Sequence, residues 1–258
     1  PVLYKPGAVF VLQGRKRGLL DGEVYLYDAA HYLAVSVPVP FRMESMASAE
    51  RPLLAVYVEF DMRLAAEIAS HLGARRAEAM AGRARALVSS PMEPEIEAVV
   101  LRLLRVLRDP VECAVLGAGI LRELHYRVLV GPQGGAMIRA LRQRGPSGRI
   151  VQSLARLRED YASGISVAAL ASAAGMSVPS YHVHFKALTG STPIQYVKAI
   201  RLHEARLMIA RRDGTIAEVA ASVGYASAAQ FSRDFKRHFG RTARDEAGWV
   251  RQHLGEPG

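Results

Sequence analysis

Polar and cationic side chains gather on one side of a short segment near the C-terminus. At roughly 100° per residue, they point away from the rings of Phe231 and Phe235. They are Gln230, Ser232, Arg233, Lys236 and Arg237. Arg suits the guanine edge, Gln and Ser bond to base edges, and cations bind phosphates. The pattern predicts a helix that places Gln230, Ser232 and Arg233 on bases and Lys236 and Arg237 on phosphates. A solvated charged helix face is the alternative.

The same pattern occurs once earlier in the chain. An offset of 50 residues relates Tyr181, Phe185, Lys186 and Gly190 to Phe231, Phe235, Lys236 and Gly240. The side chains pointing away from the rings in this first copy include Ser180, His182, Val183 and Lys186. We expect Ser180 and His182 to contact bases, Val183 to contact a thymine methyl group, and Lys186 to bind phosphate. Repetition at one place in a repeat favours recognition helices over a solvated face.

Each copy has the elements of a helix-turn-helix. A short amphipathic run begins after Ser166 or Thr215, which are both suitable N-caps. Gly175 or Gly224 follows, as a turn requires, and the second helix comes next. A helical hairpin that only packs is the alternative, but it would not require a basic second helix.

One helix is predicted between the two copies, over residues 194–210. At ~1.5 Å per residue it spans about 25 Å, somewhat less than the ~34 Å of one duplex turn. Both units could then reach successive major-groove segments on one side of the duplex. Arg201 lies on this helix and is a further candidate for phosphate binding.

The segment 150–249 resembles the DNA-binding domain of the AraC/XylS family of bacterial transcription regulators. The resemblance rests on LASAAGMS (170–177), on HFKALTGSTPIQYVKAIRLHEARLM (184–208), and on IAEVAASVGYAS followed by QFSRDFKRHFG. It implies two helix-turn-helix units joined by a long helix. The sequence departs from the family at Val183, where Arg is frequent, and at Ala243, where Pro is usual. An aromatic residue is also missing near Glu246, so we expect unusual packing of the last helix.

Composition describes a globular, basic protein. The 258 residues carry a net charge of +10 and half of them are hydrophobic, which favours a polyanionic partner such as double-stranded DNA. Cys113 is the one cysteine, so no intrachain disulfide forms, as expected in a reducing compartment. No apolar run approaches the ~18 residues that span a membrane. We expect a cytoplasmic protein without membrane contact; whether residues precede Pro1 is open.

The N-terminal third is predicted to be β. Strand candidates are residues 9–12, 23–27, 32–37 and 53–60, and the cations of Gly14–Gly18 are expected at a hairpin tip. Short strands at this spacing favour a small barrel or sandwich. The stretches 13–40 and 48–61 are also similar to the cupin-like N-terminal domain of one branch of the family. That similarity implies that residues 1–85 form a sensor for a small effector.

Effector contacts are predicted for strand aromatics and one histidine, namely Tyr25, Tyr27, Tyr32 and His31. Ordinary strand packing is the alternative for the tyrosines. His31 has no second histidine or carboxylate cluster at metal-ligand spacing, so we expect no metal, no cofactor and no enzyme activity. A cupin-type enzyme with a basic tethering domain is the alternative. A third interpretation is an interaction protein that has lost DNA binding.

Helices follow the strands, over residues 62–72, 94–107 and 113–130. We assign 86–141 to a helical pair that mediates homodimerisation, as the resemblance implies; an intramolecular cap on the barrel is the alternative. Residues 142–149 contain Pro, Gly and Ser and are predicted to be a linker, and 150–258 to be the DNA-binding domain. The fold class is therefore α+β: a small β-barrel with a helical pair, then an all-α domain. RNA polymerase is a further candidate partner.

Overall fold

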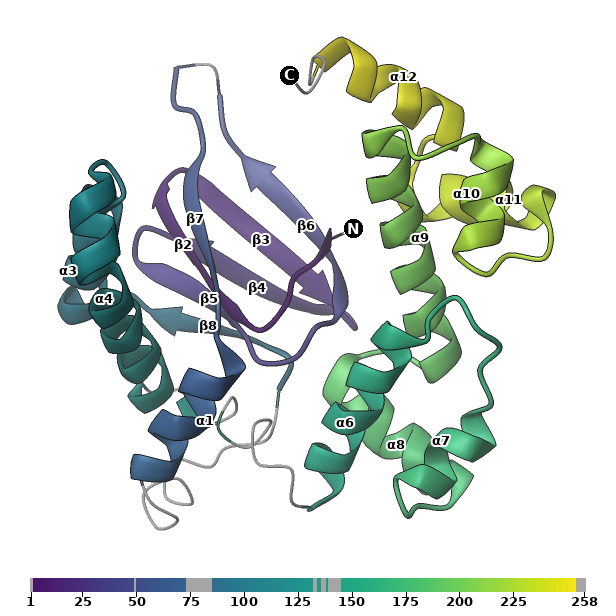
Figure 1. Cartoon of the computed structure of the whole chain (residues 1–258), viewed down its shortest axis with the longest axis horizontal. Coiled ribbons are helices and arrows are strands. Elements are labelled where there is room, and N and C mark those ends of the chain that lie inside the picture. The colour runs from purple at the N-terminus through teal and green to yellow at the C-terminus, as the bar shows by residue number, and fades with distance from the viewer. Residues whose placement is uncertain are drawn as a thin grey trace.

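The computed structural model describes residues 2–48, 50–72, 85–131, 134–135, 138 and 145–253. A curled antiparallel sheet lies in the middle of the molecule (Figure 1). The helices of the N-terminal half cover one side of it, and the C-terminal helices lie on the other (Figure 1). The predicted α+β class and the order of its parts are confirmed.

In the part of the chain that the structure describes, the sheet contains eight strands, all paired antiparallel. They are β1 (Val2–Leu3), β2 (Gly7–Gln13), β3 (Arg15–Leu20), β4 (Glu23–Asp28), β5 (His31–Val35), β6 (Pro40–Met46), β7 (Leu54–Glu59) and β8 (Leu87–Pro91). The order is β1-β6-β3-β4-β5-β2-β7, and β8 pairs with β5. The sheet curls into a half-barrel. Its β8 strand lies within the segment that the sequence assigned to the helical pair.

Both faces of the central strands are apolar because helices cover both. In β2, Val9 and Val11 belong to the inner-face cluster, whereas Ala8 and Phe10 belong to the outer-face cluster. Alternate residues of a strand point to opposite faces, so the buried residues of β2 contribute to two different hydrophobic cores. The sheet is therefore the middle layer of the molecule.

The expected hairpin tip at Gly14–Gly18 is wrong, because most of this segment forms β3 between β4 and β6. Its outward cations are neutralised across the strands: Arg15 pairs with Asp28 at 3.3 Å and Arg17 pairs with Glu44 at 2.5 Å. The turn lies further on, at Asp21–Gly22, where φ is 50° and 83°. Positive φ at both positions is the hairpin geometry that suits an Asp-Gly pair.

Within the described residues, helices α1 (Met62–His71), α3 (Pro94–Val106) and α4 (Pro110–Val130) pack on the outer face of the sheet, as Figure 1 shows. Their bounds agree with the predicted helices to within a few residues. Leu103 of α3 and Leu124 of α4 are buried among Phe10, Tyr32 and other outer-face residues. None of the helices in the described part of the chain has the length and hydropathy to cross a membrane.

The C-terminal half contains seven helices among the described residues. They are α6 (Gly145–Glu159), α7 (Val167–Ala173), α8 (Val178–Thr189), α9 (Pro193–Arg211), α10 (Ile216–Ser222), α11 (Ala228–Phe239) and α12 (Ala243–His253). Residues 145–149, predicted to be linker, form the first turns of α6. Residues 142–144 of that prediction lie outside the described residues. The long helix predicted over 194–210 is α9, at nearly the same bounds.

The buried hydrophobic residues of the C-terminal half belong to two separate clusters. Tyr181, Phe185 and Tyr196 belong to the same buried cluster as the inner face of the sheet. The Tyr196 hydroxyl also donates to the carbonyl of Pro38 at 2.7 Å. The helices from α10 onward share a separate cluster with the second half of α9. The first helix-turn-helix is thus packed against the sheet, and the second has a core of its own.

A buried histidine ties α4 to the start of α1. The N–H of Asp61 donates to Nε2 of His125 at 3.0 Å, and Nδ1 of His125 donates to the carbonyl of Leu121 at 2.7 Å. The imidazole is 2% exposed and stacks on Phe60 with ring centroids 4.3 Å apart. Burial lowers the pKa of His125, although the Leu121 bond and the Asp61 charge oppose this. The neutral ring therefore satisfies both nitrogens.

We predict that protonating His125 destabilises the fold. Its folded pKa lies below the unfolded value of about 6.5, so its contribution is present above that pH and is lost as the pH falls through the folded pKa. Denaturant unfolding between pH 7.5 and 5 should give a slope in the free energy of unfolding of up to about 1.4 kcal/mol per pH unit from this proton. His125→Gln should reduce the slope, and His71→Gln, at an exposed histidine, should not. An unchanged slope in His125→Gln would contradict this role.

Candidate nucleic-acid interface

The first helix-turn-helix consists of α7 and α8. An N-cap residue and a glycine in the turn determine where α7 begins and ends. The hydroxyl of Ser166 accepts from the N–H of Ala169 at 3.2 Å, which confirms the predicted N-cap. Gly175 has φ of 58° in the turn. The rings of Tyr181 and Phe185 lie 5.6 Å apart and are fully buried, so the face of α8 opposite the core points outward.

The second unit, α10 and α11, repeats this construction. Thr215 and Glu218 form a reciprocal capping box at the start of α10. Gly224 has φ of 86° in the turn, where a side chain would be strained. Phe231 and Phe235 are fully buried with ring centroids 5.5 Å apart. Both predicted helix-turn-helix units are thereby confirmed as folded elements.

Helix α11 carries all five of its predicted contact residues on exposed positions. They are Gln230, Ser232, Arg233, Lys236 and Arg237. The Ser232 hydroxyl donates to the carbonyl of Ala228 at 2.9 Å, within its own helix. Arg237 pairs with Asp234, whereas Arg233 and Lys236 form no ion pair with other described residues. The outer face of α11 is therefore cationic and open to a partner.

Helix α8 exposes a smaller and less charged face. Val183 is 66% exposed and Lys186 is exposed, while Ser180 and His182 are half-buried. Lys186 also borders a pocket of 320 Å³ whose other side includes Asp21 and Glu23. A Cβ built on Gly190, at the end of α8, would lie 3.0 Å from Cβ of Asp21. The β3–β4 turn thus touches the end of the first recognition helix.

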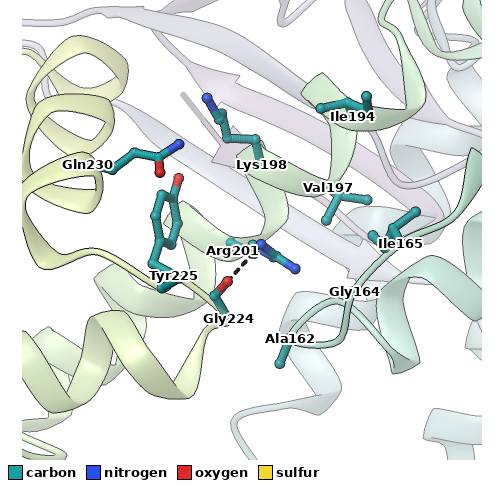
Figure 2. A pocket seen from close by; sticks show the side chains of 11 residues that line it. Ala162, Gly164, Ile165, Ile194, Val197, Lys198, Arg201, Gly224, Tyr225 and Gln230 are labelled. Carbon is teal, nitrogen blue, oxygen red and sulfur yellow. Dashed lines mark hydrogen bonds between the residues drawn. The ribbon is translucent and has the colours of Figure 1, made fainter.

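A cleft of 510 Å³ separates the two units along α9 (Figure 2). Ile194, Lys198 and Arg201 of α9 line its floor, and Gln230 of α11 lies on one wall. The sequence predicted phosphate binding by Arg201. In the structure its guanidinium donates hydrogen bonds to three backbone carbonyls. The side chain therefore lies between the two units rather than on an outer face.

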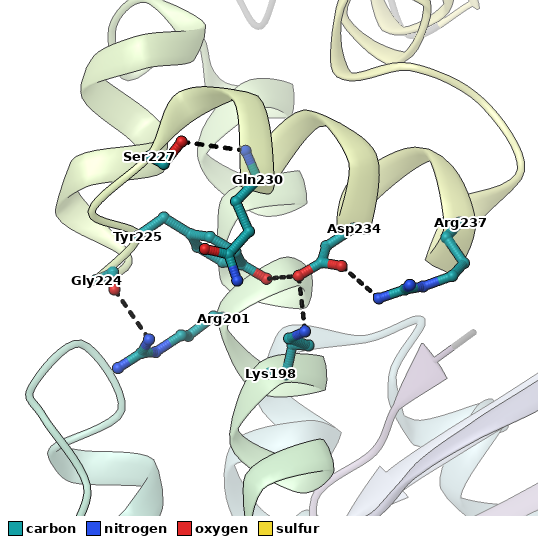
Figure 3. Close-up of polar contacts among 8 residues, drawn as sticks. All are labelled: Lys198, Arg201, Gly224, Tyr225, Ser227, Gln230, Asp234 and Arg237. Atoms are coloured by element: carbon teal, nitrogen blue, oxygen red, sulfur yellow. Dashed lines mark hydrogen bonds and ion pairs between the residues drawn. The ribbon is translucent and has the colours of Figure 1, made fainter.

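A buried carboxylate that the sequence analysis missed holds α11 on α9 (Figure 3). Asp234 is 5% exposed, and its Oδ2 lies 2.8 Å from Nζ of Lys198 and 3.4 Å from the hydroxyl of Tyr225. Arg237 pairs with the other oxygen. Burial and the Asp234 charge raise the pKa of Tyr225. The i,i+3 spacing of Asp234 and Arg237 is visible in the sequence, but the partner on α9 is not.

The last helix is held by a buried carboxylate; whether its packing departs from that of relatives, as the missing aromatic residue predicts, stays a prediction. Glu246 of α12 is 1% exposed, and its Oε1 accepts from Nε of Arg206 at 2.6 Å. Nε of Arg241 lies 3.0 Å from the other oxygen. Arg206 also lies over the ring of Phe239, 5.0 Å from its centroid. A buried ion pair therefore joins α12 to α9.

The four predicted effector-pocket residues do not come together. Tyr27 is fully buried in the inner-face cluster, and Tyr25 is half-buried beside it. Tyr32 points to the outer face against Phe10, and burial raises its pKa to about 12. His31 is exposed and lies 3.5 Å from Asp28. Tyr25 and Tyr27 share the inner face, whereas Tyr32 and His31 lie elsewhere. The described residues contain no group of three or more His, Cys, Asp or Glu able to hold a metal ion.

Lys16 of β3 is an inner-face residue that the sequence analysis missed, because its segment was taken for a turn. It is directly opposite Tyr27 on β4 and is 7% exposed. Burial lowers the pKa of Lys16. The hydroxyl of Tyr27 has no hydrogen-bond partner among the described residues. Two polar groups thus lie in an otherwise apolar interior.

Known proteins resemble the chain in sequence and in fold. Activator RhaS of Escherichia fergusonii is 32% identical over 97 residues, 38% of this chain and 35% of RhaS. Probable regulator LumQ of Photobacterium leiognathi is 40% identical over 76 residues, 30% of this chain and 31% of LumQ. The matches therefore span about a third of these relatives.

Solved structures of ToxT from Vibrio cholerae share the fold across both halves. The complex with an unsaturated fatty acid, from strain SCE256, has a TM-score of 0.68 at 12% identity and covers 99% of this chain and 90% of that one. The O395 complex with (E)-4-(8-methylnaphthalen-1-yl)but-3-enoic acid has a TM-score of 0.62 at 13% identity and covers 95% and 91%.

Family models match both halves of the chain. Residues 170–246 match a helix-turn-helix domain. Residues 1–136, more than half of the chain, match the N-terminus of AraC-type transcriptional regulators. The chain belongs to the AraC-type family of transcriptional regulators.

Proposed function

We propose that the protein is a sequence-specific DNA-binding transcription regulator that acts in the bacterial cytoplasm. The observation that carries this proposal is the exposed cationic face of α11, with α8 at the equivalent place in a second unit on the same helix. Helix α9 has 19 residues and is about 28 Å long. With the width of a unit at each end, it spaces α8 and α11 for neighbouring major-groove segments about 34 Å apart.

Base and phosphate contacts divide between the exposed residues. Arg233 and Gln230 carry the hydrogen-bond donors that distinguish bases in the groove. Lys186 and Lys236 neutralise phosphates, joined by Arg237 when DNA competes with Asp234. Ser180, His182, Val183 and Ser232 supply smaller contacts at base edges. Arg201 is left out because three of its five N–H donors bond to backbone carbonyls between the units.

We predict opposite signatures for two neighbouring cations of α11. Arg233→Ala should lower affinity for the selected site by about 1–3 kcal/mol and relax one base position. Lys236→Ala should weaken binding to all sequences and lower the salt slope by about one unit. Fluorescence anisotropy on DNA selected from a random pool, repeated from 50 to 300 mM salt, measures both effects. Wild-type discrimination in Arg233→Ala would refute the base contact, and an unchanged slope in Lys236→Ala would refute the phosphate contact.

We also propose that the effector is an apolar carboxylic acid bound at the inner face of the sheet. An anionic head group would give Lys16 a counter-charge and the Tyr27 hydroxyl an acceptor. Carbon chains suit the neighbouring apolar cluster, and the two ToxT structures hold carboxylic acids. That cluster includes the aromatic residues of α8, so a ligand there would alter how the first helix-turn-helix packs.

The effector proposal predicts that charge at Lys16 determines binding. Isothermal titration of oleate should give saturable binding to the wild type and at least a tenfold weaker affinity for Lys16→Met, since about 1.4 kcal/mol corresponds to a factor of ten. Arg17→Met is the matched control, because Arg17 points outward and pairs with Glu44. Oleyl alcohol should bind poorly to the wild type. Equal affinities for Lys16→Met and wild type, or for the acid and the alcohol, would contradict the proposal.

We further propose a homodimer formed through the outer surface of α3 and α4. The apolar side chains exposed there, and at the connection between the helices, are Leu107 (58%), Val111 (71%), Val115 (72%) and Leu116 (49%). The opposite sides of both helices pack on the sheet. A second copy would cover the same surface by two-fold symmetry.

RNA polymerase is proposed as a further partner of the protein when it is bound to DNA.

The dimer proposal predicts that a charge in this surface separates the subunits. Sedimentation equilibrium at micromolar concentration should show dimers for the wild type and monomers for Val115→Glu, because the carboxylate would be buried without a partner. Val24→Glu, at a residue of β4 that is 54% exposed, should remain dimeric. A monomeric wild type at tens of micromolar would refute this interface.

A further inference from the structure

We propose that Arg201 fixes the separation and angle of the two helix-turn-helix units and thereby sets how strictly the protein requires one spacing between two half-sites in DNA. The inference rests on the proposed function and gives Arg201 a positioning role. It replaces the phosphate contact expected from the sequence.

Arg201 contacts both units from the middle of α9, and Figures 2 and 3 show its contact with Gly224 of the second unit. Its Nε donates to the carbonyl of Tyr161 at 2.6 Å, and Nη2 donates to the carbonyl of Ser163 at 2.8 Å. Both carbonyls belong to the loop between α6 and α7, on the first unit. Nη1 donates to the carbonyl of Gly224 at 2.9 Å, in the turn of the second unit.

The guanidinium is suited to this task because it is rigid. Its N–H donors lie in one plane at fixed angles, so three carbonyls bonded to it are held in a fixed relative arrangement. A lysine ammonium has donors that rotate and a flexible stem, and it imposes no such plane. The carbonyls engage three of the five N–H donors of Arg201, one on each nitrogen.

The units also touch directly beside Arg201. A Cβ built on Gly224 would lie 2.2 Å from the carbonyl oxygen of Ala162, so only glycine permits this approach. Gly224 has φ of 86°, which a side chain would strain further. The turn of the second unit therefore rests on the backbone of the first, next to the carbonyls that Arg201 binds.

This connection matters because the units otherwise belong to different cores. The first is packed with the sheet and the second has its own cluster on the far half of α9. A helix alone fixes the distance between them but allows bending and twisting about its axis. Arg201 adds a second link across the cleft, so the two helix-turn-helix units keep one relative position when they bind DNA.

The experiment compares the full-length chain on four DNAs. One carries both half-sites selected by the wild type, two carry a single half-site with the other scrambled, and one carries both half-sites with one extra base pair between them. Arg201→Met is the test variant. Arg211→Met is the control, because Arg211 is an exposed cation at the end of α9 and forms no hydrogen bond or ion pair with the described residues of either unit.

Arg201→Met should bind each single half-site within about twofold of the wild type, with the same salt slope. It should bind the full site at least about tenfold more weakly, because uncoupled units lose part of their effective concentration. Adding a base pair should weaken wild type and Arg211→Met strongly, but Arg201→Met by less than about threefold. An unreduced spacing penalty, or weaker half-site binding with a lower salt slope, would overturn the inference.

Folding of each variant is checked by circular dichroism and thermal melting. Should Arg201→Met not fold, Arg201→Lys keeps the charge but not the planar fork, and the same loss of spacing strictness is expected. A lysine variant with the wild-type spacing penalty would overturn the inference. Failure of the wild type to select any two-part site would refute the proposed function instead, so the two failures are distinct.

Discussion

The shared hydrophobic core of the sheet and the first helix-turn-helix is the constraint on which the rest of the architecture depends. Tyr181, Phe185 and Tyr196 are fully buried in one cluster with the inner strands. Burying a large apolar side chain contributes about 1.5–3 kcal/mol, so separating the first helix-turn-helix from this cluster would cost considerable stability. The inner face of the sheet is thus connected to α8 through the residues of one hydrophobic cluster, with α9 lying against β1 and β6.

The second helix-turn-helix is attached by a different kind of force. Its own core packs on the far half of α9, and two buried carboxylates, Asp234 and Glu246, bind cations of that helix. Hydrophobic contact is non-directional, whereas an ion pair with hydrogen bonds requires a particular geometry. These pairs orient α11 and α12 on α9. The orientation matters for a unit that must present one face of a helix to a groove.

Local patterns in the sequence predicted both helix-turn-helix units correctly. Aromatic residues four apart and glycines in turns leave a signature within a few residues. The missed features depend on partners far away in the chain. Arg15 and Arg17 read as a charged turn, because their partners Asp28 and Glu44 are 13 and 27 positions away. The sequence likewise predicts Arg201 to be an ordinary surface cation, since the backbone carbonyls that accept its hydrogen bonds can belong to any residue type.

The core common to the sheet and α8 limits how this protein can be recombined. A hybrid that joined residues 145–253 to the sensor of a distant relative would leave a broad apolar surface on the first unit without its cover. The turn at Asp21 also contacts the end of α8 beside Gly190. The sheet that covers the first unit must therefore also fit the shape of this end of α8. Such a hybrid would therefore need a sheet whose inner face fits the apolar residues that the C-terminal half contributes to the shared cluster.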